Sequence, residues 1–143
     1  MLPSMLNQTT LPVLEQAVTF AEARHGVLAG NIANIDTPGY KTRDLSPELF
    51  QANLKRAIEK RDAEPAAELS PGLMAPRERT RELDAFSEVR ESTKHILYHD
   101  QSDVSLESQV TELAKNQSMH NMAISLLTQQ FRLLEAAITE RVA

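Results

Sequence analysis

The sequence predicts a mainly α-helical protein, with long N- and C-terminal helices packed as an α-helical coiled-coil hairpin and an irregular, partly disordered middle segment. Apolar residues near both ends alternate at three- and four-residue intervals, which is the heptad spacing of packed helices. Aromatic residues are only 4% of the 143-residue chain, and four of its seven prolines fall in the middle. We divide the chain into an N-terminal helix and turn (1–45), a variable middle segment (46–105) and a C-terminal helix (106–143).

The N-terminal helix is expected over residues 11–35. Thr10 can cap its start, and Pro12 is tolerated in a first turn whose amides lack intrahelical partners. The helix should end before Pro38, because the residue preceding a proline avoids the α region. Pro38 and Gly39 suit the centre of a type II turn, in which glycine supplies the positive φ. The expected seam, meaning the apolar stripe that packs on other helices, comprises Leu11, Leu14, Val18, Ala21, His25, Leu28, Ile32 and Ile35.

The C-terminal helix is expected from Leu106 almost to the end of the chain. At about 1.5 Å per residue it would be about 55 Å long, against about 36 Å for the N-terminal helix. Because the shorter helix cannot cover the longer one, and burial of a leucine-sized side chain contributes roughly 1.5–3 kcal/mol, we expect partner helices to cover the remainder. A compact three-helix bundle closed by the middle segment is the alternative. The expected seam comprises Leu106, Val110, Leu113, Gln117, His120, Ile124, Leu127, Phe131, Leu134 and Ile138, widened by Ala123, Leu126, Leu133 and Ala137.

The middle segment carries weaker signals. Residues 47–60 form an amphipathic pattern, with Phe50, Leu54 and either Ala57 or Ile58 on one side, and predict a short helix. Residues 61–88 combine prolines with many charges, which indicates a loop or disorder. The short apolar run at 94–99 is compatible with a strand or an extended stretch.

Composition and charge give little support to an enzyme or a nucleic-acid-binding protein. The chain has no cysteine, which removes disulfides, thiolate metal sites and cysteine nucleophiles. Its formal net charge of −5 does not favour binding to a phosphate backbone. The first residues lack the pattern of a cleaved signal peptide, and no apolar stretch is long enough to span a bilayer. We therefore expect no catalysis, no cofactor, no nucleic-acid partner and no direct membrane span.

Histidines are the remaining candidates for chemistry. His95 and His99 have the spacing of a metal pair on a helix, but the surrounding sequence is not typical of a helix and supplies no further histidine or cysteine at ligand spacing. We expect no metal site there, and a metal-dependent enzyme stays only as a third hypothesis. His25 and His120 fall on the two seams, where polar residues more often set register or partner choice.

The most specific pattern lies where the N-terminal helix should end. Small residues at Ala29, Gly30 and Ala33 would let another backbone approach closely, and Asn31 and Asn34 can bond free backbone groups near a helix terminus. An ordinary helix stop does not require so many specified residues. The pattern comprises Asn31, Ile32, Ala33, Asn34, Thr37, Pro38, Gly39 and Tyr40.

This pattern resembles the N-terminal signature of the bacterial flagellar axial proteins, the family of rod, hook and hook-associated subunits. The continuation Lys41–Leu45 and the C-terminal Glu112–Gln117 are most similar to a proximal rod subunit. The resemblance covers residues 11–45 and 104–138. It implies that paired terminal helices line a hollow, torque-transmitting tube in the periplasmic part of the flagellar basal body. FlgC, a sibling rod protein, is the alternative within the family, and a cytosolic helical chaperone or adaptor is the alternative outside it.

The resemblance also implies partners and a route of export. The expected partners are other copies of the chain, the rod protein FlgC, the basal-body adaptor FliE and the flagellar export gate. Export would use the flagellar type III apparatus without a cleaved signal peptide. Subunits of this family dock at the gate through a short Phe-x-x-x-apolar element, and Phe50 and Leu54 have that spacing. Amphipathic packing explains the same two residues equally well.

Overall fold

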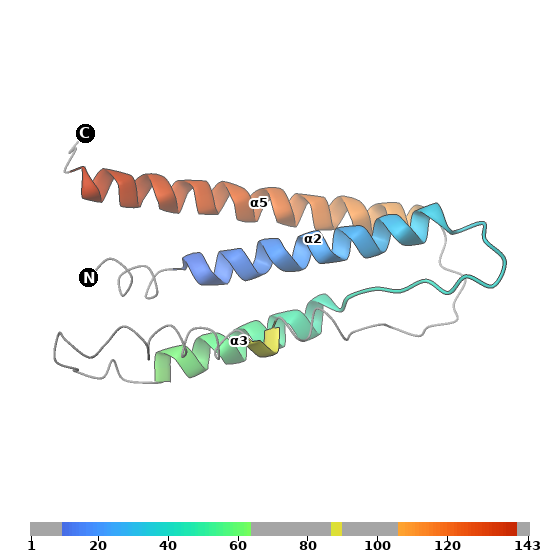
Figure 1. Cartoon of the computed structure of the whole chain (residues 1–143), viewed down its shortest axis with the longest axis horizontal. Helices are drawn as coiled ribbons and strands as arrows, with labels where there is room; N and C mark the ends of the chain where they lie inside the picture. Colours follow the sequence, from blue (N-terminus) through green and yellow to red (C-terminus); the bar gives the residue numbers. More distant parts are fainter. Residues whose placement is uncertain (1–9, 64–86, 90–105, 140–143) are drawn as a thin grey trace.

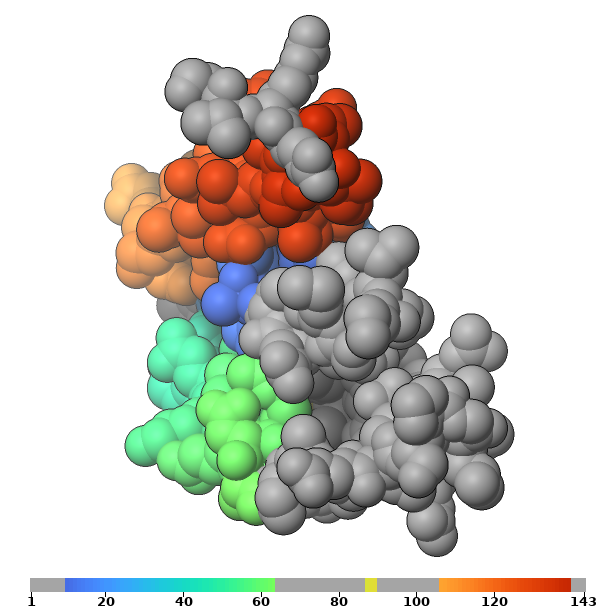
Figure 2. Space-filling view, turned by 90° about the vertical axis from the view of Figure 1, so that its left-hand side faces the viewer, coloured from blue at the N-terminus to red at the C-terminus, as the bar shows by residue number. Residues whose placement is uncertain are grey.

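Three helices make up most of the chain that the computed structural model describes, which comprises residues 10–63, 87–89 and 106–139. They are α2 (Leu11–Ala33), α3 (Pro47–Ala63) and α5 (Leu106–Ile138). Helix α2 runs antiparallel to both neighbours and lies between them (Figure 1), and the end-on view also places α5 and α3 on opposite sides of α2 (Figure 2). The predicted fold class, a hairpin of long terminal helices, is confirmed. Because α2 lies between the other two helices, α3 does not cover α5 as it would in a closed three-helix bundle.

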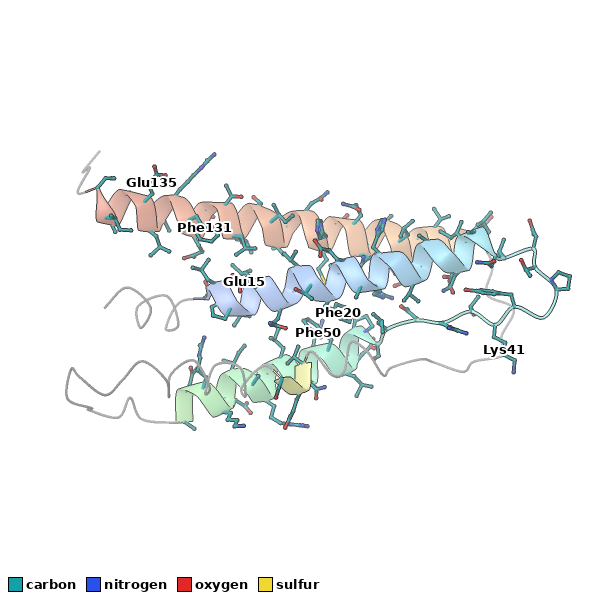
Figure 3. All side chains as sticks on the ribbon, in the orientation of Figure 1. Glu15, Phe20, Lys41, Phe50, Phe131 and Glu135 are labelled. Atoms are coloured by element: carbon teal, nitrogen blue, oxygen red, sulfur yellow. The ribbon has the colours of Figure 1, made fainter. Side chains whose placement is uncertain are left out.

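Helix α5 is longer than α2, as expected from the sequence. It has 33 residues and α2 has 23, which correspond to about 50 Å and about 35 Å. The last turns of α5, which carry Glu135, continue past the beginning of α2 (Figure 3). Several large apolar side chains of α5 are therefore exposed, among them Phe131 and Ile138.

The two ends of α2 test the predicted start and stop signals. Pro12 lies in the first turn and the helix ends at Ala33, short of Pro38, as predicted. The prediction that Thr10 caps the helix is wrong, because its side chain makes no capping hydrogen bond. Thr10 has helical dihedral angles (φ −77°, ψ −2°), whereas a capping side chain requires an extended residue. Its carbonyl instead accepts a bond from the Leu14 amide at 3.1 Å.

Helix α3 begins with a side-chain cap on a buried serine. The Leu49 amide donates to Ser46 Oγ at 3.2 Å, and Ser46 Oγ donates to Glu48 Oε2 at 2.7 Å. The hydrogen bond from Ser46 lowers the pKa of Glu48 below its ordinary value. The helix predicted over 47–60 is thus present and extends to Ala63.

An aromatic stack joins α3 to α2. The rings of Phe20 and Phe50 point toward one another (Figure 3) with centroids 4.1 Å apart and planes 12° from parallel. Such contacts add to the burial of two large apolar side chains. The predicted apolar side of α3 therefore faces the core, and this stack anchors α3 to α2. The other buried members of the cluster are Leu45, Ala57 and Val89, and Val13, Val27, Leu54 and Met119 pack around it.

Candidate assembly surface

The interface between α2 and α5 combines alanine and amide side chains with a buried leucine. Ala21 and Leu28 of α2 and Asn116 of α5 are at most 1% exposed. Asn116 Nδ2 donates to the Ala21 carbonyl at 2.7 Å, a contact that side chains larger than alanine at this position would crowd. Gln109 and Ala123 are also buried on the same side of α5. The two helices thus pack closely without using most of the large apolar residues of α5.

At about half of the predicted seam positions, the buried residue is the one just before the predicted residue. In α2, Arg24 and Asn31 are buried where the prediction placed His25 and Ile32. His25 is exposed, so it does not pack between α2 and α5, and its predicted role in register or partner choice stays a prediction. In α5, Gln109, Asn116 and Ala123 are buried one residue before Val110, Gln117 and Ile124. Two other predicted seam residues, Ala21 and Leu28, are fully buried, and Leu113 is half-buried.

This one-residue offset leaves a second apolar strip, which we call the open flank. Phe20 and Val27, which come just before the buried Ala21 and Leu28, belong to or pack on the α3 cluster, and so does Met119, which comes just before the half-buried His120 near α2. Residues just after interface positions therefore lie on the opposite flank, because successive helix residues are separated by about 100°. Ile32, Val110 and Ile124 each follow a buried interface residue, and Val18, Phe131 and Ile138 continue the same seven-residue spacing along the two helices. Together they form the open flank, in which Val18 and Ile32 are half-buried and Val110, Ile124, Phe131 and Ile138 are 48%, 42%, 54% and 65% exposed.

The predicted seam residues thus divide into three groups. Leu11, Ala21 and Leu28 are buried. Leu14, Leu113, Leu127 and Leu134 are half-buried, as is His120. The open-flank residues form the third group. Leu106, Met122, Leu126 and Leu133 add further exposed apolar surface to α5.

Asn31 joins the end of α2 to both the following turn and α5. Its side chain is 0% exposed, and its Nδ2 donates to the Arg43 carbonyl and to Gln109 Oε1, the latter at 3.0 Å. Its Oδ1 accepts from the Tyr40 hydroxyl at 3.2 Å and from the Arg43 amide at 3.1 Å. A primary amide offers two donors and two acceptor positions, and all four are used. One residue of the predicted pattern therefore fixes the turn against the C-terminal helix.

The chain turns at Pro38 and Gly39 as predicted. The Tyr40 amide donates to the Thr37 carbonyl at 3.1 Å, which closes a four-residue turn with Pro38 and Gly39 at its centre. Gly39 has φ +77°, the value that the third residue of a type II turn requires. Asn34 bonds the Gly30 carbonyl through Nδ2 at 2.8 Å, the backbone contact expected for this residue. The turn is presented at one end of the hairpin, with Lys41 nearby (Figure 3).

A buried arginine forms a second link among the same segments. Arg24 donates to Asp44 through Nε at 2.8 Å and Nη2 at 2.6 Å, and Nη2 also reaches Glu112 Oε2 at 3.0 Å. The hydrogen bond from Lys115, and then that from Arg24, lowers the pKa of Glu112. The pKa of Arg24 is raised, chiefly by its hydrogen bonds to Asp44. Two cations and two carboxylates thus form a neutral cluster that joins α2, the segment after the turn and α5.

The described parts of the chain contain no group of three or more side chains suited to hold a metal ion. His120 lies near α2, with Nε2 3.7 Å from Glu22 Oε1, and the remaining candidates His95 and His99 fall outside the described residues. Within the same ranges, none of the helices combines the length and apolarity needed to cross a bilayer.

Comparisons with known proteins agree with the pattern around the turn. A family model described as "Flagella basal body rod protein" matches residues 14–41, which cover most of α2 and the turn. The flagellar basal body rod protein FlgB of Bacillus subtilis (strain 168) is 30% identical over 136 residues, covering 91% of this chain and 93% of the relative. The chain belongs to the FlgB family of flagellar basal body rod proteins.

Other members of the FlgB family match over similar lengths. FlgB of Escherichia coli (strain K12) is 29% identical over 82% of this chain and 84% of the relative, and FlgB of Borrelia hermsii is 28% identical over 80% and 84%. No solved structure matches the chain. The chain is thus a component of the flagellar basal body rod.

The sequence prediction missed several residues that organise this FlgB-family hairpin. Arg24 and Glu112 are separated by 88 positions, and neither shows a local signal of the other. Gln109 and Asn116 are polar and were therefore not assigned to an interface. Phe20 lies beside the expected seam, and only its size among few aromatic residues indicated a core role.

Proposed function

We propose that this chain is a structural, non-catalytic subunit of the proximal rod, which polymerises through its terminal helices into a hollow, torque-transmitting tube. The observation that carries this proposal is the open flank. Val110, Ile124, Phe131 and Ile138 form an apolar strip on a long helix of a chain that belongs to a rod-protein family. Large contiguous apolar surfaces on soluble proteins mark sites of association. Partner helices that cover this strip would stiffen the assembly.

The proposal includes the location and partners of the subunit. It is exported through the flagellar type III apparatus without a cleaved signal peptide and assembles in the periplasmic part of the basal body. There it contacts other copies of itself, the rod protein FlgC, the adaptor FliE and the export gate. It requires no cofactor and does not itself cross the membrane. The names of the reported relatives favour FlgB over the alternative FlgC.

Deletion of the gene tests the proposal directly. Cells that lack the protein should be non-motile, and their basal bodies should stop before rod formation, because later rod subunits have no base on which to assemble. An epitope-tagged copy should restore swimming and co-purify with isolated basal bodies. Complete rods in the deletion strain, or a complementing protein that stays in the cytoplasm, would exclude the assignment in favour of a chaperone or adaptor.

We also propose that Phe50 and Leu54 dock the unfolded chain at the export gate. In the folded structure Phe50 is 5% exposed and Leu54 is half-buried, so docking requires α3 to leave α2. Phe50→Ala should reduce the secreted amount about tenfold in a strain that cannot retain rod subunits, by loss of one apolar anchor of roughly 1.5–3 kcal/mol. Secretion is measured by immunoblot of the culture supernatant.

The matched control removes the stacking partner. Phe20→Ala breaks the same aromatic stack and should destabilise the folded core about as much, but it leaves the docking pair intact. Docking predicts normal secretion of Phe20→Ala and reduced secretion of Phe50→Ala. Equal secretion of both variants would leave Phe50 with a packing role alone.

A further inference from the structure

Two glycines inside α2 are not required by any contact with the residues that the structure describes. A Cβ atom built on Gly26 or on Gly30 meets no other atom within 4 Å, and neither residue has a positive φ. Glycine in a helix interior is destabilising relative to alanine, because it loses more backbone freedom on folding. Small residues near the end of this helix let another backbone approach closely. No contact in the described part of the subunit therefore explains either glycine.

The glycines belong to a small-residue face of α2, defined by Ala23, Gly26, Gly30 and Ala33. Ala23, Gly26 and Ala33 are exposed and Gly30 is half-buried, so neither α5 nor α3 covers this face. The face repeats every seven residues, from Ala23 to Gly30 and from Gly26 to Ala33. It offers a shallow row of positions into which side chains of another helix can insert.

The open flank of α5 has the complementary shape. Ile124, Phe131 and Ile138 are also seven residues apart, and each is at least 42% exposed. Two helices whose contact residues both repeat every seven residues can stay in register, with the knobs of one entering the holes of the other. Neither surface can meet the other within one subunit, because the small-residue face points to solvent while α5 occupies a different side of α2.

We propose that the open flank of one copy receives the small-residue face of α2 from the next copy. This inference rests on the proposed function and identifies which faces meet in the polymer. The two contacting surfaces differ, so the contact is heterologous and leaves one face of each kind free at the ends of a row. Contacts of this type build rings or helical polymers rather than closed two-fold dimers. A second copy is therefore the occupant that both surfaces fit.

The absence of cysteine from the chain allows a direct crosslinking test. One strain co-expresses an epitope-tagged Gly26→Cys copy and an untagged, larger fusion of Ile124→Cys, and basal bodies are isolated and oxidised. The proposal predicts a disulfide-linked band that contains both copies. Disulfides require Cα atoms within about 7 Å, so the band reports direct contact. The control pairs Gly26→Cys with Ser118→Cys, an exposed position on another side of α5, and should give no mixed band.

Three outcomes separate this inference from the proposed function. A mixed band only for the Gly26 and Ile124 pair supports it. Intact basal bodies that contain both copies but yield no such band, or yield it equally with the Ser118 control, overturn the pairing and leave the rod assignment standing. Absence of the wild-type protein from basal bodies overturns both.

Substitution of Gly26 provides a second, independent test. Gly26→Leu should maintain or raise the thermal midpoint of the purified subunit, because leucine has the higher helix propensity and the surrounding space is open. The same variant should lower swimming-halo expansion at least tenfold, because the side chain fills the position that receives the neighbouring helix. Normal swimming by Gly26→Leu would overturn the inference, as would a matching loss of subunit stability.

Discussion

Replacing Phe131 by aspartate should abolish rod assembly and swimming while leaving the subunit folded. The side chain is 54% exposed and lies near the end of the α2–α5 contact, so few interactions within the subunit are lost. In the assembled rod the same side chain is expected to be buried, which contributes roughly 1.5–3 kcal/mol per contact. The variant would replace that gain with the larger cost of burying an unpaired carboxylate. Soft-agar swimming and electron microscopy of basal bodies measure the outcome, and circular dichroism checks the fold.

Ser125→Asp is the matched control for this prediction. It introduces the same charge on the same helix at an exposed position outside the open flank. It should therefore swim nearly normally. If Phe131→Asp also swam normally, the open flank would not be an assembly surface. If both variants failed alike, added negative charge on α5 would explain the effect without any specific contact.

The fold class and the turn were predictable because both depend on local signals. Heptad spacing near each end predicts helices that pack on helices, and Pro38 with Gly39 predicts a turn whose third residue has positive φ. Helix boundaries followed from the same kind of signal. The cap at Thr10 failed because residue type alone does not specify the backbone conformation that a capping side chain requires.

The internal register was only half predictable, for a physical reason. Apolarity and spacing selected Val110 and Ile124 for the seam, whereas the folded hairpin buries Gln109 and Asn116, and Ala123, which was expected only to widen the seam. Apolar residues indicate surfaces that become buried somewhere, but they do not distinguish burial within a subunit from burial between subunits. On α5 the subunit interface buries Gln109, Asn116 and Ala123, and most of the large apolar side chains of this helix remain exposed. The sequence therefore indicated an apolar surface without indicating which part of it meets which helix.

Sequence patterns did not predict the polar contacts between residues far apart in the chain. The bonds from Arg24 to Glu112 and from Asn31 to Gln109 join residues 88 and 78 positions apart. Each becomes visible only when α2 and α5 are antiparallel in one particular register. These bonds explain the polar residues near the turn, because they hold the end of α2, the turn and the start of α5 together as one unit.

Replacing Asn31 by alanine should destabilise the subunit by about 3 kcal/mol, out of a total of about 5–15 kcal/mol for an ordinary domain. The variant leaves Gln109 Oε1, the Tyr40 hydroxyl and both backbone groups of Arg43 without the partner they now have. A buried polar group without a partner costs about 1–3 kcal/mol, and access of water to part of the site offsets some of the sum. Urea denaturation followed by circular dichroism measures the change.

Asn34→Ala separates this effect from a general preference for asparagine near the end of α2. Asn34 is three residues further on and half-exposed, and its side chain bonds only the Gly30 carbonyl among the contacts observed, so its replacement should cost less than about 1 kcal/mol. Asn31 also holds the first turn of α5 through its bond to Gln109. In Asn31→Ala this first turn should loosen, so a protease should cut near Gln109 earlier than near Leu127. Equal destabilisation by the two variants would refute the role assigned to Asn31 as the link between the turn and the C-terminal helix.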